Sequence, residues 1–252
     1  MQIGSLHGQP LPAEFCLYAA SDSAYFDQFA VSFFRSAHIN ADIPVHLHLY
    51  NPRSDQLALC ARHGVSASWE TVDSTQFYTA ANGINQSPND GLRRTQSAMA
   101  KGGDQSVLDR LIKTYYACAR FIRLAELVSA PVFAVDIDAV IRGPLPKLQD
   151  QDLWIHHVDG RDPRFLAGGI WVNNLNFLKQ YASALIQTLE CDCVYWGMDQ
   201  DVLNEIVPSW RHAQLPETLI DWNMRPSSAV WTAKGTRKDL SVFKQEQKKY
   251  YA

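Results

Sequence analysis

The 252-residue sequence has few of the features that mark secreted, membrane-spanning or nucleic-acid-binding proteins. Its five cysteines form an odd number without a CxxC pair, which is typical of free thiols in a reducing compartment. No apolar run approaches the roughly 20 residues that cross a bilayer, and residues 1–7 lack the basic and apolar regions of a secretion signal. The formal net charge of −3 provides no cationic field for nucleic acid. We therefore expect a cytoplasmic protein that does not bind nucleic acid.

The composition is that of a globular chain. Apolar residues make up 46% of the sequence and charged residues 19%, which is enough apolar material for one core and excludes an intrinsically disordered or collagen-like protein. The 13 Gly and 12 Pro are scattered, and there is no internal repeat or convincing linker. We expect residues 1–252 to form a single domain.

Apolar strands alternate with amphipathic helices along the chain, which predicts an α/β fold with a central mixed sheet flanked by helices. Strands are expected at 14–20, 44–50, 132–141, 153–155 and 168–173, and helices at 25–36, 54–63, 106–128, 175–189 and 199–206. Residues 82–105 are rich in Asn, Gly, Ser and Gln, which predicts a mobile loop. The polar segment 222–252 is predicted to be irregular, with 239–252 as a C-terminal tail.

Two aspartates, Asp136 and Asp138, end the most apolar predicted strand of the chain. Charged side chains are rarely buried without a partner. Residues i and i+2 of a strand face the same side, so both carboxylates could converge on one Mg²⁺ or Mn²⁺ ion that bridges the phosphates of a nucleotide. The alternative is a pair of strand-end aspartates that cap a loop or bind an arginine.

Other potential metal ligands give weaker signals. His46 and His48 share one side of a predicted strand and could bind zinc, but no further His or Cys is positioned nearby in the sequence, so a half-buried strand is favoured. Cys191 and Cys193 alone are also a weak metal signal.

The helical segment from Lys113 to Leu127, followed by Val132-Phe-Ala-Val-Asp-Ile-Asp138, resembles the approach to the DxD motif of GT-A fold glycosyltransferases. The retaining galactosyl- and glucosyltransferases of glycosyltransferase family 8 are the most similar. Four further segments resemble that family in the required order. They are Ala20-Ser-Asp-Ser-Ala-Tyr25, Phe165-Leu-Ala-Gly-Gly-Ile-Trp-Val-Asn173, Met198-Asp-Gln-Asp-Val-Leu-Asn204 and Trp231-Thr-Ala-Lys-Gly-Thr-Arg-Lys238. The resemblance covers residues 15–238.

The resemblance implies a single-domain GT-A (Rossmann-like) fold and a UDP-sugar donor site. In such enzymes the first turn holds uracil and ribose, and the C-terminal turn holds the diphosphate; a glycine and lysines suit a diphosphate physically. The implied donor contacts are Ala20, Asp22, Tyr25, Arg120, Asp136, Ile137, Ala167, Gly168, Lys234, Gly235 and Lys238. A structural ion pair with an aspartate is the alternative role for Arg120.

The sequence departs from the family at two positions. The implied metal ligands are Asp136, Asp138 and a His three residues before Gly235, and that third position is Thr232 here. We therefore expect Mn²⁺ or Mg²⁺ to be bound more weakly, through water or diphosphate oxygens. Leu166 replaces the usual Asn, so one polar contact to the donor sugar is missing or made elsewhere.

The implied reaction is metal-dependent transfer of a hexose, with glucose or galactose expected, and with retention of anomeric configuration by analogy. Gln200 is expected to position the sugar near its reacting carbon, and Asp199 to bind donor hydroxyls. The alternative role for Asp199 is a helix N-cap, and one residue can serve both.

The expected acceptor is a hydroxyl of a glycan, a lipid-linked sugar or a protein, with Trp196 and Trp222 as candidate members of its groove. The lysines and tyrosines at 244–251 could make peripheral contact with an anionic membrane that carries lipid-linked acceptors. A frayed, solvated tail is the favoured alternative.

Two other classes compete with the transferase. The pair Asp136 and Asp138 also matches the DxDx(T/V) signature of haloacid-dehalogenase-like phosphohydrolases, in which the first Asp attacks phosphorus. That motif should open its domain, however, and 135 residues precede it here. The departures at Thr232 and Leu166 also allow a catalytically silent protein that binds a nucleotide sugar.

Overall fold

The computed structural model describes residues 1–73, 75–77, 103–157, 160, 165–190, 194–233 and 235–251. These residues build a large mixed sheet from β1 (Leu6–Gly8), β2 (Cys16–Asp22), β3 (Val45–Tyr50), β4 (Ser66–Glu70), β5 (Val132–Val135), β7 (Leu153–His157), β8 (Phe165–Val172) and β9 (His212–Gln214). Their order across the sheet is β1-β4-β3-β2-β5-β8-β7-β9. A small second sheet has the order β10-β11-β6, from β6 (Ala139–Ile141), β10 (Ile220–Asp221) and β11 (Val230–Thr232).

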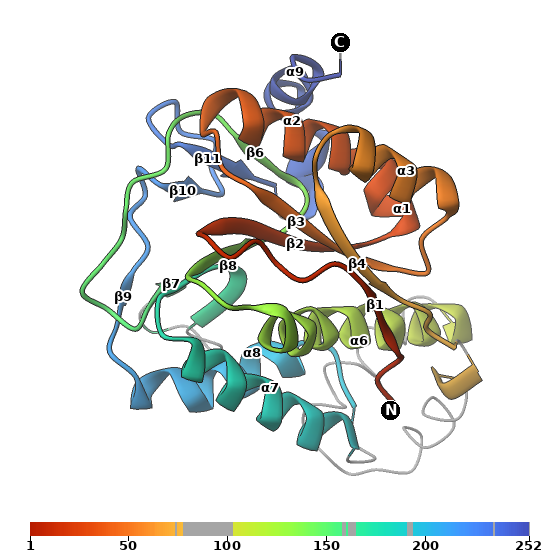
Figure 1. The fold of residues 1–252 in the computed structure, drawn as a ribbon. Helices are drawn as coiled ribbons and strands as arrows, with labels where there is room; N and C mark the ends of the chain where they lie inside the picture. Colours follow the sequence, from red (N-terminus) through yellow and green to blue (C-terminus); the bar gives the residue numbers. More distant parts are fainter. Residues whose placement is uncertain are drawn as a thin grey trace.

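Helices cover both faces of the large sheet. They are α1 (Ser23–Tyr25), the π-helical turn η1 (Phe26–Ala30), α2 (Val31–Asn40), α3 (Ser54–Arg62), α6 (Gly103–Leu127), α7 (Leu175–Glu190), α8 (Met198–Ile206), the 3₁₀ turns η2 (Val207–Ser209) and η3 (Gly235–Asp239), and α9 (Ser241–Lys248). In Figure 1, α6, α7 and α8 lie on one side of the sheet and α1, α2, α3 and α9 on the other. The chain has one apolar core on each side, so the fold is a three-layer α/β sandwich, as the sequence predicts.

The parallel strands β4, β3, β2 and β5 form the middle of the large sheet. In such sheets, ligands bind at the carboxyl ends of the strands. Asp22 is the last residue of β2, and Asp136 follows directly after β5. The sheet therefore brings two polar segments that are far apart in sequence to one edge.

Strand β3 is buried along its whole length, because both faces of the sheet are covered there. The imidazoles of His46 and His48 form hydrogen bonds with Ser66 and Ser68 of the neighbouring strand. The two histidines are therefore core residues of a fully buried strand. Cys191 and Cys193 lie outside the described residues.

The prediction of one continuous strand over 132–141 is wrong. The chain leaves the large sheet after Val135, turns through residues 136–138 and enters the small sheet as β6. The turn is closed by the amide of Ala139, which donates to the carbonyl of Asp136. Apolar residues continue through this turn because both sheets are buried, so hydropathy alone hides the break.

The prediction of an irregular, frayed C-terminal segment is also wrong. Strand β11 and helix α9 form there, because Phe243 and Tyr250 are buried in the core beside α2. Lys244, Lys248 and Lys249 are exposed, and membrane contact through them stays a prediction.

Most of the predicted loop 82–105 lies outside the described residues, and its last three residues belong to α6.

Among the described helices, none combines the length and the hydropathy needed to cross a bilayer. The thiols of Cys16, Cys60 and Cys118 are buried and free, in agreement with the expectation for these three residues.

Candidate active site

A pocket of about 480 Å³ opens at the carboxyl edge of β2 and β5. Of the residues expected to bind the donor or the metal ion or to act in catalysis, those in its wall are Ala20, Asp22, Tyr25, Arg120, Asp136, Ile137, Asp138, Ala167, Gly168, Asp199, Gln200, Gly235 and Lys238. Thr232 lies behind this wall, and Lys234 lies outside the described residues. The fold thus gathers segments from six parts of the chain around one cavity.

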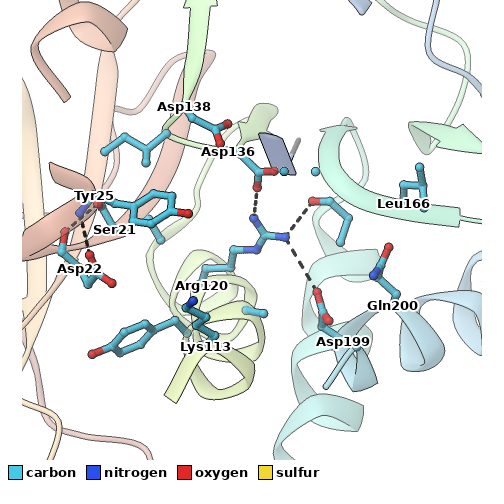
Figure 2. A pocket seen from close by; sticks show the side chains of 18 of the residues that line it. Ser21, Asp22, Tyr25, Lys113, Arg120, Asp136, Asp138, Leu166, Asp199 and Gln200 are labelled. Carbon is cyan, nitrogen blue, oxygen red and sulfur yellow. Dashed lines mark hydrogen bonds and ion pairs between the residues drawn. The ribbon is translucent and has the colours of Figure 1, made fainter. Parts of the chain in front are cut away.

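Arg120 of α6 lies at the centre of the pocket, between its two halves (Figure 2). Its guanidinium donates to Asp136 Oδ1 at 2.5 Å and to the carbonyl of Ala167 at 3.0 Å. A third partner, Asp199, lies 3.9 Å away. Burial opposes the charge of Arg120, but the two carboxylates outweigh it and raise its pKa above the usual range. Arg120 therefore forms an ion pair with an aspartate, and it still faces the cavity.

Asp199 is the second residue of α8, and Gly197 is the N-cap. Gly197 has φ 92°, a left-handed conformation that glycine adopts without strain. The alternative that Asp199 caps this helix is therefore wrong. Its side chain is buried, and burial raises the pKa of its carboxyl despite the nearby Arg120.

Asp138 is a nearly buried carboxylate in the pocket wall, with only 5% of the residue exposed. Its Oδ1 accepts a hydrogen bond from the Thr232 hydroxyl at 3.1 Å, and its Oδ2 lies 2.6 Å from Lys238 Nζ. Burial and the charge of Asp136 raise the pKa of Asp138 to about 6, against the opposing effect of Lys238. The ion pair connects the DxD turn to η3.

Tyr25 and Asp22 form one end of the pocket, on the side away from Gln200 (Figure 2). The Asp22 carboxylate caps α1 by accepting from the Tyr25 amide at 2.8 Å. The Tyr25 ring is 38% exposed, which is unusual for a large aromatic side chain in this chain. A partly exposed aromatic ring beside a carboxylate suits a base and its sugar hydroxyls.

The opposite end is formed by β8 and α8, with Leu166 and Gln200 (Figure 2). Asn204 holds these two elements together, because its side chain accepts from the Phe165 amide and donates to the carbonyls of Phe165 and Gln200. A Cβ at Gly168 would meet Asp136 Oδ2 at 3.0 Å. A larger residue at position 168 would therefore have to displace the Asp136 carboxylate by a few tenths of an ångström.

Some lining residues were not singled out from the sequence as site residues. Lys113, Tyr116 and Ala117 lie on the same face of α6 as Arg120. They precede Arg120 by seven, four and three residues, which is the spacing of one helix face, so the sequence could have predicted that they line the same site. Ser21, Tyr50 and Gly197 carried no such signal. Trp196 and Trp222, which were expected in the acceptor groove, also line the pocket.

The donor set near the DxD turn consists of the carboxylates of Asp136 and Asp138 and the hydroxyl of Thr232. Oxygen donors of this kind suit Mg²⁺ and Mn²⁺, which proteins commonly bind through one or two carboxylates and substrate phosphates. These residues therefore fit such an ion. In the part of the chain that the structure describes, no group of three His, Cys, Asp or Glu side chains could hold a metal by itself.

Charges in the described pocket wall nearly balance. Asp22, Asp136, Asp138 and Asp199 face Lys113, Arg120 and Lys238. A bound diphosphate would make this wall strongly negative overall, so an additional cation would favour its binding. This charge count gives a physical reason for a metal ion beside a diphosphate.

The phosphohydrolase alternative requires the DxD motif on the first strand of its domain. The structure instead has β1 to β4 before β5, and the first aspartate of the motif forms an ion pair with Arg120. A carboxylate held in this way is a poor nucleophile, because its charge is already stabilised.

No protein-family model and no curated protein matches the chain. Solved structures do match. The galactosyltransferase LgtC, in complex with donor and acceptor sugar analogues, has a TM-score of 0.54 and 14% identity, covering 94% of this chain and 96% of LgtC. GlyE of Streptococcus pneumoniae TIGR4 has a TM-score of 0.57 and 12% identity over 96% of this chain, which spans 60% of GlyE. An LgtC variant with an active-site glutamine changed to glutamate has a TM-score of 0.54, 13% identity and coverages of 94% and 96%. These similarities establish the fold as that of GT-A glycosyltransferases.

Proposed function

We propose that the chain is a glycosyltransferase that moves a hexose, glucose or galactose, from a UDP-sugar to an acceptor hydroxyl. One observation carries this proposal: a single pocket has an aromatic end at Tyr25, charged groups in the middle and an amide with a buried carboxylate at the other end. This order is that of the base, the diphosphate and the sugar in a nucleotide sugar. The fold supports it, because LgtC and GlyE are glycosyltransferases.

The nucleoside would occupy the end formed by Ala20, Asp22 and Tyr25. The exposed Tyr25 ring offers a stacking face for uracil. Asp22 uses Oδ1 to accept from the Tyr25 amide, and its carboxylate can accept further hydrogen bonds from ribose hydroxyls.

The diphosphate would lie between Arg120 and the η3 turn. Arg120, Gly235 and Lys238 would supply donors to it. Asp136 and Asp138 would hold Mn²⁺ or Mg²⁺, and the buried Thr232, behind Asp138, would be a weak third ligand at most. When bound, the metal ion would neutralise charge on the leaving diphosphate. Arg120 and Lys238 would also stabilise the leaving diphosphate, because positive groups fixed in a partly buried pocket stabilise a leaving group as its charge develops.

The sugar would lie beside Asp199 and Gln200, with the backbone of Ala167 and Gly168 close by. Gln200 presents an amide, and Asp199 is paired with Arg120, so neither offers a free carboxylate nucleophile. We propose that Gln200 positions the reacting carbon and that the configuration is retained. The active-site glutamine of LgtC supports a role for an amide at this kind of site.

The acceptor would be a hydroxyl of a glycan, a lipid-linked sugar or a protein. Trp196 is 44% exposed at the pocket, and Trp222 also lines it. Aromatic rings of this kind stack on pyranose faces. We also propose membership of glycosyltransferase family 8, with Thr232 in place of the family's metal-binding His and Leu166 in place of its Asn.

An assay of released UDP tests the proposal. Purified protein is incubated with UDP-glucose, UDP-galactose or GDP-mannose, each with Mn²⁺ or with EDTA. We expect slow, Mn²⁺-stimulated release of UDP from one UDP-sugar, because water can replace a missing acceptor. Turnover of a generic phosphomonoester, with no release from any nucleotide sugar, would contradict the transferase and favour the phosphohydrolase.

The substitution Asp138→Asn tests the metal site in the same assay. It should abolish UDP release while leaving the thermal unfolding midpoint within a few degrees, because the amide keeps the shape but loses the charge. Asp239→Asn is the matched control, since Asp239 is exposed on η3 outside the pocket wall. Substantial activity of the Asp138→Asn protein would contradict the metal site.

A further inference from the structure

The ammonium group of Lys238 is held by three contacts within the pocket. Its Nζ lies 2.6 Å from Asp138 Oδ2 and 3.0 Å from the Tyr25 hydroxyl, and it also lies 4.4 Å from the centroid of the Tyr25 ring. The Lys238 side chain is only 19% exposed. The lysine therefore contacts both the nucleoside end and the DxD turn.

The Lys238 ammonium group occupies Oδ2, the Asp138 oxygen that Thr232 does not contact. Because Thr232 donates to Oδ1 and Lys238 approaches Oδ2, both oxygens of this nearly buried carboxylate have partners. A divalent ion must then compete with an ammonium group for Asp138. Asp136 is likewise paired with Arg120, although its side chain is 38% exposed.

We propose that Lys238 keeps metal binding at Asp138 weak until a nucleoside diphosphate arrives. The inference depends on the proposed function. The diphosphate gives the lysine a new anionic partner in the same pocket, which releases Asp138 to the metal ion. Metal and nucleotide binding are therefore positively coupled, and each raises the affinity for the other by the same factor.

The chemistry of the two cations explains why Lys238 moves and Arg120 stays. A lysine is a point charge on a flexible four-carbon stem, so it can exchange one anion for another with little cost in geometry. Arg120 holds Asp136 and the Ala167 carbonyl at once through a planar fork. Moving it would break both hydrogen bonds, whereas Lys238 exchanges one carboxylate for a more highly charged group.

Mn²⁺ binding without nucleotide tests this directly. Free Mn²⁺ is measured by electron paramagnetic resonance at about pH 8, where aspartate carboxylates are ionised, in the wild type and in Lys238→Met, with and without UDP. For the wild type, we expect UDP to tighten Mn²⁺ binding by about tenfold or more, within the usual range of coupling between sites. For Lys238→Met, we expect tighter Mn²⁺ binding without UDP, weaker UDP binding and a coupling factor smaller than that of the wild type.

Two further variants serve as controls. Lys238→Arg keeps a cation beside Asp138 and should keep Mn²⁺ binding weak. Lys244→Met removes one positive charge from α9, outside the pocket wall, and should leave both affinities unchanged. Thermal unfolding establishes that each variant is folded, and Lys238→Gln replaces Lys238→Met if the latter unfolds.

The outcomes separate the two proposals. Unchanged, weaker or undetectable Mn²⁺ binding by folded, nucleotide-free Lys238→Met or Lys238→Gln would overturn the role of Lys238. Failure of the wild type to bind UDP under any condition would contradict the proposed function instead. Tighter Mn²⁺ binding by the variant would then still show that Lys238 competes for Asp138.

Discussion

Two arginines of helix α6, Arg120 and Arg123, show how one helix serves both the core and the pocket. Arg123 is 3% exposed and forms ion pairs with Glu70 and Glu126. It also donates to the carbonyl of Gly4, so it ties the N-terminal segment to β4. Arg120, one turn earlier, donates to Asp136 and Ala167 and faces an open cavity.

The two arginines have different roles because their carboxylate partners differ in exposure to solvent. Glu70 is fully buried and also accepts from the Tyr115 hydroxyl, so the Arg123 cluster is closed by the fold. Asp136 is 38% exposed and borders the cavity, so a ligand can add to the Arg120 cluster. Removing one partner of a closed charge cluster is strongly destabilising, whereas a cluster that borders a cavity is available to a ligand.

The largest expected effect is on stability, from Arg123→Ala. Loss of this arginine leaves the buried Glu70 carboxylate without its cation, which costs about 3–5 kcal/mol in unfolding free energy. Urea unfolding measures it. Glu126→Gln, at the 44% exposed partner, should cost under about 1 kcal/mol. A loss from Arg123→Ala no larger than that of the control would contradict the comparison.

Arg120→Ala should mainly affect turnover. We expect UDP release to fall by about 10²–10³-fold, since a fixed donor to a developing anion is worth that much. Its unfolding free energy should fall by less than that of Arg123→Ala, because water can solvate Asp136 and the buried Asp199 lies 3.9 Å from the guanidinium, beyond hydrogen-bond distance. Arg211→Ala, at an exposed ion pair outside the pocket, is the control. Equal turnover of the Arg120→Ala and Arg211→Ala proteins would contradict the role of Arg120.

Low pH should destabilise the fold through the buried histidines of β3. Burial lowers the pKa of His46 to about 4, and burial together with Arg123 lowers that of His48 well below its usual value. The unfolded chain therefore binds more protons than the folded chain below about pH 6.5, and stability falls as pH decreases by up to about 1.4 kcal/mol per unit for each histidine. Urea unfolding from pH 7 to about pH 5 checks this. His46→Gln should reduce the slope, and an unchanged slope would contradict it.

The smallest expected effect is at the nucleoside end. Tyr25→Ala should weaken UDP binding by about 0.5–1.5 kcal/mol through loss of ring stacking, while Tyr25→Phe should retain most of it. Calorimetric titration compares the two variants. If Tyr25→Phe loses as much affinity as Tyr25→Ala, the hydroxyl and not the ring makes the contact.

Local pattern predicted the main alternation of strands and helices but missed β1, β4 and the short strands β9 to β11, and the family resemblance supplied the segments that meet at the pocket. Asp22 and Asp136 follow the carboxyl ends of parallel strands, and that edge follows from strand order. Helix pattern alone does not separate the roles of Arg120 and Arg123, because both fit the same pattern; the resemblance singled out Arg120, and the tertiary contacts of Arg123 could not be predicted. The turn at 136–138 and helix α9 were missed for a similar reason: burial against distant segments determines both.

Titration of UDP into the wild type and into Arg120→Ala, with Mn²⁺ and with EDTA, tests the central claim most directly. The account predicts one site per chain in the wild type, tighter with Mn²⁺, and strongly weakened binding in Arg120→Ala. Binding that is equally strong in both proteins, or absent from the wild type with and without Mn²⁺, would contradict a nucleotide-sugar site in this pocket.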